Sequence, residues 1–222
     1  MHTWAVEAAD CAPYLDVSSP TRECGKTRLF EALELVVRKP RRCTGHTEAT
    51  LFRMIESEHP TLLLDEIDTT FGKDPKLYAG IRGVLDEGHR RGGSVPRMVG
   101  EGKNMMMKFF DVFGPKAFAG IGTLPETIAS RSIPIRLERK SRGEKVARLR
   151  YSRERAASGE LREALAEWAS AAAEVLSAAE PAFPEELSDR QWDLWEPLFA
   201  IADLTGSSSE ARKAAVALHA GA

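Results

Sequence analysis

The sequence predicts an α/β protein: a three-layer αβα core with a parallel sheet over residues 1–140, followed by an all-helical region over residues 141–222. Short apolar runs alternate with helical patterns through the first 140 residues, which is typical of βαβ units. Beyond Lys140, Ala, Glu, Arg and Leu dominate at helical spacing. The length of 222 residues, with 43% hydrophobic and 29% charged, fits one large globular domain or one domain with a small appendage.

The individual elements of the core follow from the spacing of apolar residues. We expect strands at residues 14–17, 61–65, 116–121 and 132–137. We expect helices at residues 27–37, 47–57 and 75–89, with a basic turn before the second and a capping residue at Thr47. Two strand-like runs around a glycine-rich turn predict a hairpin inserted near residues 94–110. Five apolar residues lie in its second strand: Met105, Met106, Met107, Phe109 and Phe110. They favour core packing of alternate residues, and an adaptable surface that binds a partner is the other interpretation.

Charge and capping residues organise the second part of the chain. Ten basic and three acidic residues lie between Arg131 and Arg155, whereas four basic and twelve acidic residues follow to the end, within a total net charge of −2. These stretches are expected to face different partners, unless they are only solvated helix faces. The residues expected to cap or end successive helices are Ser158, Ser188, Ser207 and Gly206.

Several classes of protein are disfavoured by composition. No run of about 18 apolar residues exists, so no membrane span or membrane partner is expected. The first residues lack the pattern of a secretory signal. Cys11, Cys24 and Cys43 have no CxxC spacing, which argues against a disulfide framework and a closed zinc site. We therefore expect a reducing, cytoplasmic location.

The stretch from Pro20 to Thr27 carries the main functional signal. It follows an expected strand and opens an expected helix. A phosphate chain requires converging backbone N–H groups, a helix N-terminus, a lysine and a hydroxyl for Mg²⁺. Gly25, Lys26 and Thr27 supply these in order, and Cys24 and Arg28 flank them. Pro20 replaces the first glycine of the usual GxxxxGK[ST] pattern, so the loop must begin with a different geometry.

An acidic strand end forms the second half of the expected site. About forty residues after Lys26, an apolar run ends in Asp65 and Glu66. Asp65 is expected to hold Mg²⁺ and Glu66 to polarise an attacking water, unless the acids only form a turn. Asp68 is expected to be a turn or capping residue. Together with the phosphate loop, this pattern predicts ATP and Mg²⁺ binding.

These residues resemble the AAA+ branch of P-loop ATPases. The resemblance implies that Thr123 is a polar sensor after a strand and that Arg131 is an arginine finger reaching a neighbouring subunit. It also implies that the helical tail is a lid, from which Arg190 folds over the nucleotide. Alternatively, Arg131 is a surface arginine, and Arg190 is the ion-pair partner of Asp189.

More closely, residues 13–206 resemble an uncharacterised family of P-loop domains found in bacterial and phage replication proteins similar to primase-helicases. The resemblance is carried by Ser19-Pro20 with Cys24 to Thr27, Gly120 to Gly122 with Leu124-Pro125, Arg131 to Ile135, and Ser188 to Arg190 with Trp195 to Leu198 and Ile201 to Leu204. It implies an ATPase associated with nucleic acid. Because the chain begins close to its phosphate loop, we expect a partner domain and part of an adenine pocket to be missing from it.

The expected function is Mg²⁺-dependent ATP hydrolysis that drives DNA translocation or unwinding in the replication of a phage or mobile element. By the AAA+ resemblance, Lys103 at the hairpin tip contacts a nucleic-acid phosphate, and the basic stalk residues Arg90, Arg91, Arg97 and Lys108 favour the same partner; a solvated turn is the alternative. The expected partners are other copies of the chain, single-stranded DNA and replication proteins. The rival functions are a nucleotide-gated regulatory or binding module with slow hydrolysis, and a degenerate fragment that binds nucleotide poorly.

Overall fold

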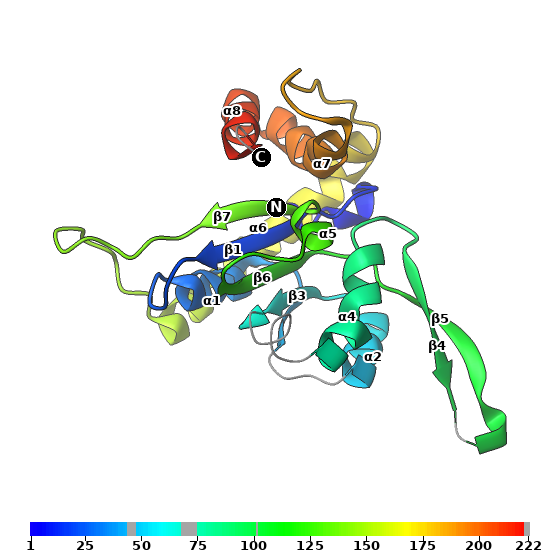
Figure 1. Ribbon diagram of the computed structural model, residues 1–222. Coiled ribbons are helices and arrows are strands. Elements are labelled where there is room, and N and C mark those ends of the chain that lie inside the picture. Colours follow the sequence, from blue (N-terminus) through cyan, green and yellow to red (C-terminus); the bar gives the residue numbers. More distant parts are fainter. Residues whose placement is uncertain (44–47, 68–74, 101, 220–222) are drawn as a thin grey trace.

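A parallel sheet lies at the centre of the computed structural model, which describes residues 1–43, 48–67, 75–100 and 102–219 (Figure 1). Its five strands lie in the order β2–β3–β6–β1–β7, and every neighbouring pair in it is parallel. The strands are β1 (Tyr14–Ser19), β2 (Pro40–Cys43), β3 (Thr61–Leu64), β6 (Lys116–Ile121) and β7 (Ser132–Arg136). The predicted α/β class and parallel sheet are therefore confirmed. Thr47 and Asp68 lie outside the described residues.

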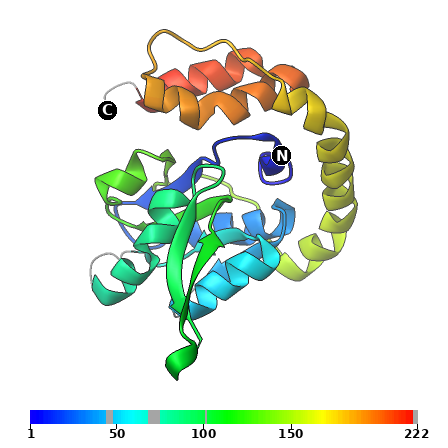
Figure 2. The ribbon, with the colours of Figure 1, turned by 90° about the vertical axis from the view of Figure 1, so that its right-hand side faces the viewer.

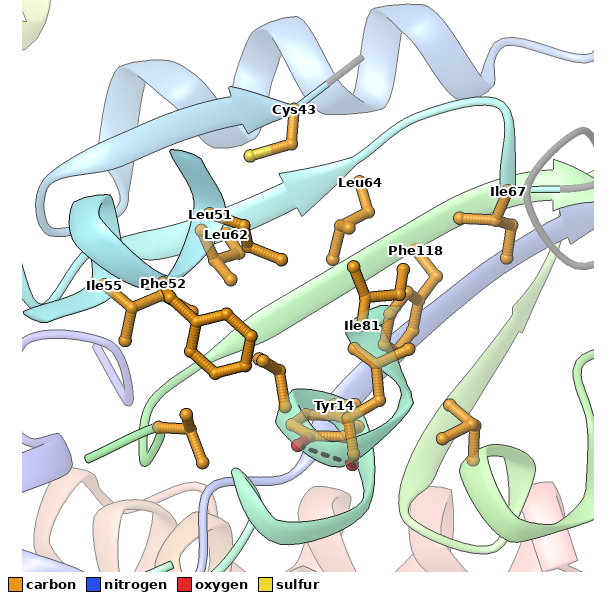
Figure 3. Close-up of a cluster of buried hydrophobic side chains, with 14 of the residues drawn as sticks. Tyr14, Cys43, Leu51, Phe52, Ile55, Leu62, Leu64, Ile67, Ile81 and Phe118 are labelled. Carbon is orange, nitrogen blue, oxygen red and sulfur yellow. Dashed lines mark hydrogen bonds between the residues drawn. The ribbon is translucent and has the colours of Figure 1, made fainter. Parts of the chain in front are cut away.

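Helices cover both faces of this sheet. On one face, α1 (Lys26–Val36) places Phe30 in a buried cluster with Val17 and Leu63. The other face is covered by α2 (Glu48–Glu58), α4 (Pro75–Glu87) and the short α5 (Glu126–Ala129). The side chains between these helices and the sheet form a second buried cluster, which Figure 3 shows. In it, Tyr14 donates a 3.0 Å hydrogen bond to the carbonyl of Leu85. Alternate residues of the strands thus face two different helical layers, as expected for a sheet buried on both sides.

The edge strand β2 was not predicted, because its residues look like a basic turn. Only Cys43 is buried among its four residues, while Arg41 is exposed. An edge strand needs no continuous apolar run, and Pro40 occupies its first position, where a missing N–H is tolerated. The expectation of a turn at this place is therefore wrong.

The predicted hairpin is present and protrudes from the body of the molecule (Figures 1 and 2). It consists of β4 (Ser94–Val99), the 3₁₀ turn η2 (Gly102–Asn104) and β5 (Met106–Asp111). Near its base, Phe110 packs against Phe52 of α2, with ring centroids 5.4 Å apart. The expectation of core packing is wrong for the other apolar side chains of β5 and the residue before it: Met105, Met106, Met107 and Phe109 are 47%, 64%, 62% and 63% exposed.

Three helices make up the C-terminal region: α6 (Tyr151–Ser177), α7 (Asp189–Thr205) and α8 (Ser208–His219). As predicted, Ser188 caps α7 in a capping box with Gln191, and Gly206 ends α7 in the left-handed conformation. α8 begins directly after Ser207. The prediction that Ser158 caps a helix is wrong, because Ser158 lies inside α6 and its hydroxyl donates to the carbonyl of Arg155 at 3.0 Å.

The N-terminal residues connect the C-terminal helices to the core. Ala5, beside the 3₁₀ turn η1 (Val6–Ala8), shares a buried cluster with Ala172 of α6 and Ile201 of α7. The Trp4 indole N–H donates to the carbonyl of Val36 at the end of α1, at 2.7 Å. Among the described residues, no helix combines the length and the apolar character needed to cross a membrane.

Candidate functional site

The loop between β1 and α1 presents backbone N–H groups to one end of the sheet. Glu23 and Gly25 both have positive φ, at 64° and 93°, so the chain turns sharply before the helix. Gly25 is the N-cap of α1, and no side chain caps this helix end. The N–H groups of the first turn and the positive end of the helix dipole are therefore available to an anion.

Lys26 opens α1 and lies back over the loop. Its ammonium group donates to the Ser19 hydroxyl at 2.5 Å and to the Thr21 carbonyl at 3.4 Å. Thr27 is exposed in the same turn. Arg28 is instead held along its own helix by an ion pair with Glu31 at 2.5 Å. Lys26 and Thr27, rather than Arg28, therefore remain beside the loop.

Cys24 fills the interior of the loop. Its side chain is buried, with the sulfur 3.4 Å from the Thr21 hydroxyl oxygen. The hydrogen bond with Thr21 lowers the pKa of the Cys24 thiol. The residue therefore packs the loop from within.

Asp65 lies at the carboxyl end of β3, two residues after Leu63. Leu63 packs with Phe30 of α1, so the alternation of side chains in a strand turns Asp65 to the same face of the sheet as α1. One Asp65 oxygen accepts from Arg42 of β2, and the other accepts from the Glu66 backbone N–H at 3.0 Å. Burial is the largest single influence and opposes the charge of Arg42, but the hydrogen bond to Asp65 and the nearby acidic charges together raise the Arg42 pKa. Glu66 is exposed, with φ of 56°.

The loop and Asp65 lie at one edge of the sheet, the edge formed by the carboxyl ends of its strands. Only β6 separates β1 from β3. The connection after β1 leads to α1 on one face, whereas the connection after β6 leads to α5 on the other. Ligands of open α/β sheets bind outside such a switch point. Thr123 is exposed just after β6, so it also lies at this edge.

Arg131 lies at the opposite edge. Its carbonyl accepts from the Tyr14 N–H at 3.0 Å, which places it beside the amino ends of β1 and β7. Because β1 has six residues, this position is roughly 20 Å from the carboxyl edge. The guanidinium contacts an Asp86 carboxylate oxygen of α4 at 3.1 Å and the Thr127 carbonyl at 2.6 Å. Arg131 is therefore remote from Lys26 of its own chain.

Arg190 shares a cleft with Arg131. This cleft has a volume of about 500 Å³ and lies between the amino edge and the start of α7. Besides the two arginines, its lining includes Cys11, Asp86, His89, Asp189 and Asp193. Burial and then the charge of Arg131 lower the pKa of His89 to about 4. The structure therefore brings Arg190 together with Arg131, and not with the loop around Lys26 over which it was expected to fold.

Lys103 belongs to η2, at the turn of the hairpin, as predicted. The four cations expected to give the stalk a basic character are each neutralised by an acid. The pairs are Arg90–Asp193 at 2.5 Å, Arg91–Asp10 at 3.4 Å, Arg97–Glu48 at 2.5 Å and Lys108–Glu56 at 2.5 Å. The stalk is thus a set of internal ion pairs and exposed methionines rather than a basic surface.

Two residues of the site were not anticipated from the sequence. Ser19 accepts from Lys26, and Arg42 holds Asp65. Ser19 is the residue just before Pro20, so its place at the end of a strand was the available signal. Arg42 carried no such signal, because it lies on the unpredicted strand β2.

Comparison with known proteins adds a match to the C-terminal part only. The model of a family of proteins of unknown function, DUF3631, matches residues 136–222. The match runs from the last residue of β7 through α8 and does not include Lys26 or Asp65. No curated protein matches the chain.

Proposed function

We propose that this protein is a P-loop ATPase of the AAA+ type that requires Mg²⁺. One observation carries the proposal: the uncapped N-terminus of α1, with Lys26, lies at the same edge and on the same face of the sheet as Asp65. A nucleotide needs both features, since the first binds phosphate and the second supports the metal.

The loop residues fit the phosphates of ATP. The backbone N–H groups from Gly25 to Thr27 donate hydrogen bonds to the phosphate oxygens, and the Lys26 ammonium exchanges the Ser19 hydroxyl for a phosphate oxygen. Among the described residues, no cluster of three or more His, Cys, Asp or Glu side chains exists that would hold a metal alone. This fits Mg²⁺, which keeps several waters and is shared between phosphates and one or two protein ligands.

Thr27 and Asp65 are the proposed ligands of Mg²⁺. The Thr27 hydroxyl would hold the ion, and Asp65, whose two oxygens already accept hydrogen bonds, would support it. When bound, Mg²⁺ neutralises charge that develops on the phosphate oxygens. Glu66, exposed beside Asp65, orients the attacking water and accepts its proton.

Arg131 acts on the site of a neighbouring subunit. Its position at the amino edge prevents it from reaching Lys26 of its own chain, and a guanidinium stabilises transition-state charge through two hydrogen bonds. The protein therefore works as a homo-oligomer, with Thr123 as a sensor beside each nucleotide. In this proposal α6, which packs on α1, and the following helices form the lid.

The task of the ATPase is movement along DNA. Measuring hydrolysis with and without single-stranded DNA at low salt separates this task from that of a nucleotide-gated module. A motor is stimulated by the DNA. A module that only switches partners binds ATP, hydrolyses it slowly and does not respond.

The central test compares ATP hydrolysis by wild type, Lys26→Ala and Glu66→Gln. Loss of Lys26 removes a positive charge that stabilises the negative phosphate groups in the transition state. The rate of ATP hydrolysis is therefore expected to fall by about 10²-fold or more. Glu66→Gln is expected to bind Mg-ATP but hydrolyse it slowly. Lys213→Ala, on the exposed surface of α8, is the matched control and keeps the wild-type rate. Equal rates for Lys26→Ala and Lys213→Ala would reject the proposal.

A further inference from the structure

The chain between β7 and α6 forms an extended basic segment, here called the basic arm (residues 139–150). Figure 1 shows it projecting from the end of β7 before it turns back to α6, on the side of the molecule opposite to the hairpin. Six of its 12 residues are Arg or Lys, and only Glu144 is acidic. All six cations are exposed.

The cations of the arm are unusual because they have so few partners. Within the described part of the chain, Arg139 is the only one of the six in an ion pair, with Glu23 at 3.1 Å. The other five are Lys140, Arg142, Lys145, Arg148 and Arg150. Five mutually repelling charges held along one segment favour binding of a polyanion, which would neutralise them together.

A basic groove continues the arm on the molecule's surface. The groove has a volume of about 530 Å³ and lies between the end of α1, the start of β2 and the first turns of α6. Four cations line it, Lys39, Arg41, Arg155 and Arg162, together with the acid Glu34. Arg41 is paired with Glu58 at 2.6 Å, so the other three carry the positive charge of the groove. Because α6 begins at Tyr151, directly after the arm, and Tyr151 also lines the groove, the arm leads into the groove.

The root of the arm is attached to the phosphate loop. The Leu137 N–H donates to the Ser18 carbonyl of β1 at 2.8 Å. Arg139 contacts both the Glu23 carboxylate and the Arg22 carbonyl, the latter at 3.4 Å. A ligand on the arm therefore lies next to the residues that precede Lys26.

We infer that the basic arm and groove bind the phosphate backbone of nucleic acid, without reading its sequence. A single-stranded or duplex backbone offers the repeated negative charge that a segment with five unpaired cations matches. A lipid surface fits less well, because the arm exposes one large apolar side chain, Val146, whereas membrane-binding segments need an apolar face. The inference deepens the proposed ATPase function by moving the DNA contact from the hairpin tip to the arm.

The test measures binding of a fluorescently labelled 20-nucleotide single strand of mixed sequence by anisotropy, with the full chain and no ATP. Lys145→Gln/Arg148→Gln removes two charges from the arm, and Arg53→Gln/Lys213→Gln removes two exposed charges from α2 and α8. The arm variant is expected to bind about tenfold or more weakly at 100 mM salt, with a salt slope less steep by about 1.4. The control variant keeps wild-type affinity.

A second measurement does not depend on substitutions. Trypsin cleaves after Arg and Lys, so the exposed arm is a preferred site, and bound DNA is expected to slow cleavage between residues 139 and 150. Equal weakening by both double variants, unprotected cleavage, or tight binding to phosphatidylserine vesicles without binding to DNA would each overturn the inference. Because ATP is absent, these results stand apart from those of Lys26→Ala: a chain that binds DNA but does not hydrolyse ATP keeps the inference and rejects the ATPase.

Discussion

Positively charged side chains have different surroundings at the amino edge and the carboxyl edge of the central sheet, that is, at the two ends of its parallel strands. At the amino edge, Arg131 contacts Asp86, and the buried Lys116 donates to the carbonyls of Gly88, Val112 and Gly114 at 3.0–3.1 Å. At the carboxyl edge, Lys26 meets a hydroxyl and a carbonyl, and the arm beyond Arg139 has no acid partner among the described ion pairs. Stability is concentrated at the first edge, and charge available to an anionic ligand at the second.

The largest expected effect concerns Arg131 at the amino edge, which we propose to act on the nucleotide site of a neighbouring subunit. Arg131→Ala is expected to lower the ATPase rate by about 10³-fold, because an arginine that stabilises transition-state charge contributes on that scale. In a mixture of Arg131→Ala and Glu66→Gln chains, activity is expected to return at some shared sites. These are the sites where an Arg131→Ala chain, which keeps Glu66, lies next to a Glu66→Gln chain, which supplies Arg131. The measurement is the rate per subunit across mixing ratios.

The control for this mixing experiment is Arg53→Ala, which removes an exposed arginine of α2. It should mix with Glu66→Gln to give only the sum of the separate rates. If the Arg131→Ala mixtures also follow that sum at every ratio, Arg131 does not act in a shared site. It would then serve only its contacts with Asp86 and the Thr127 carbonyl.

Sequence patterns predicted the helices and strands better than they predicted which residues meet across the fold. The strand β6 was predicted with its bounds, and β1, β3 and β7 to within two residues, because buried strands carry continuous apolar runs. The edge strand β2 was missed, since edge strands need no such run. Lys26 and Asp65 were found from local patterns, and the parallel order of β1, β6 and β3 brings them to one edge.

Long-range partners were beyond local patterns. The ion pairs that neutralise Arg97 and Lys108 join the hairpin to acids of α2 about fifty residues earlier, so the basic stalk predicted from composition is not free charge. Arg190 was expected near the nucleotide from its place in the tail, but the packing of α7 brings it to the cleft of Arg131. Charge counts along a chain do not reveal which charges meet across the fold.

A smaller effect should appear in the pH dependence of stability, through Lys116. Burial lowers the pKa of Lys116 to about 7, from 10.5 in the unfolded chain. Between these values the unfolded chain holds a proton that the folded protein has lost, so stability rises with pH. From pH 7 to 8.5 the expected gain in unfolding free energy is at most about 2 kcal/mol.

Urea denaturation of wild type and Lys116→Met at several pH values measures this gain. Lys116→Met lacks the titrating group, so its stability is expected to change less over the same range. The N-terminal amine, whose pKa burial also lowers, contributes equally to both proteins. His89, with a pKa lowered to about 4, contributes only at more acidic pH. Identical pH slopes for both proteins would show that Lys116 does not lose its proton in the folded state.

The smallest effects compare one ion pair from each edge. Asp86 and Arg131 have side chains only 21% and 17% exposed, whereas Arg139 and Glu23 at the carboxyl edge are 62% and 82% exposed. Asp86→Asn leaves the mostly buried Arg131 guanidinium without its carboxylate, also breaks the pair of Asp86 with the exposed Arg82, and is expected to cost about 1–2 kcal/mol. Arg139→Gln is expected to cost less than about 0.5 kcal/mol, because solvent screens an exposed pair. Thermal unfolding of both variants measures the difference. A larger loss for Arg139→Gln would mean that the root of the arm, rather than the amino edge, holds this part of the fold together.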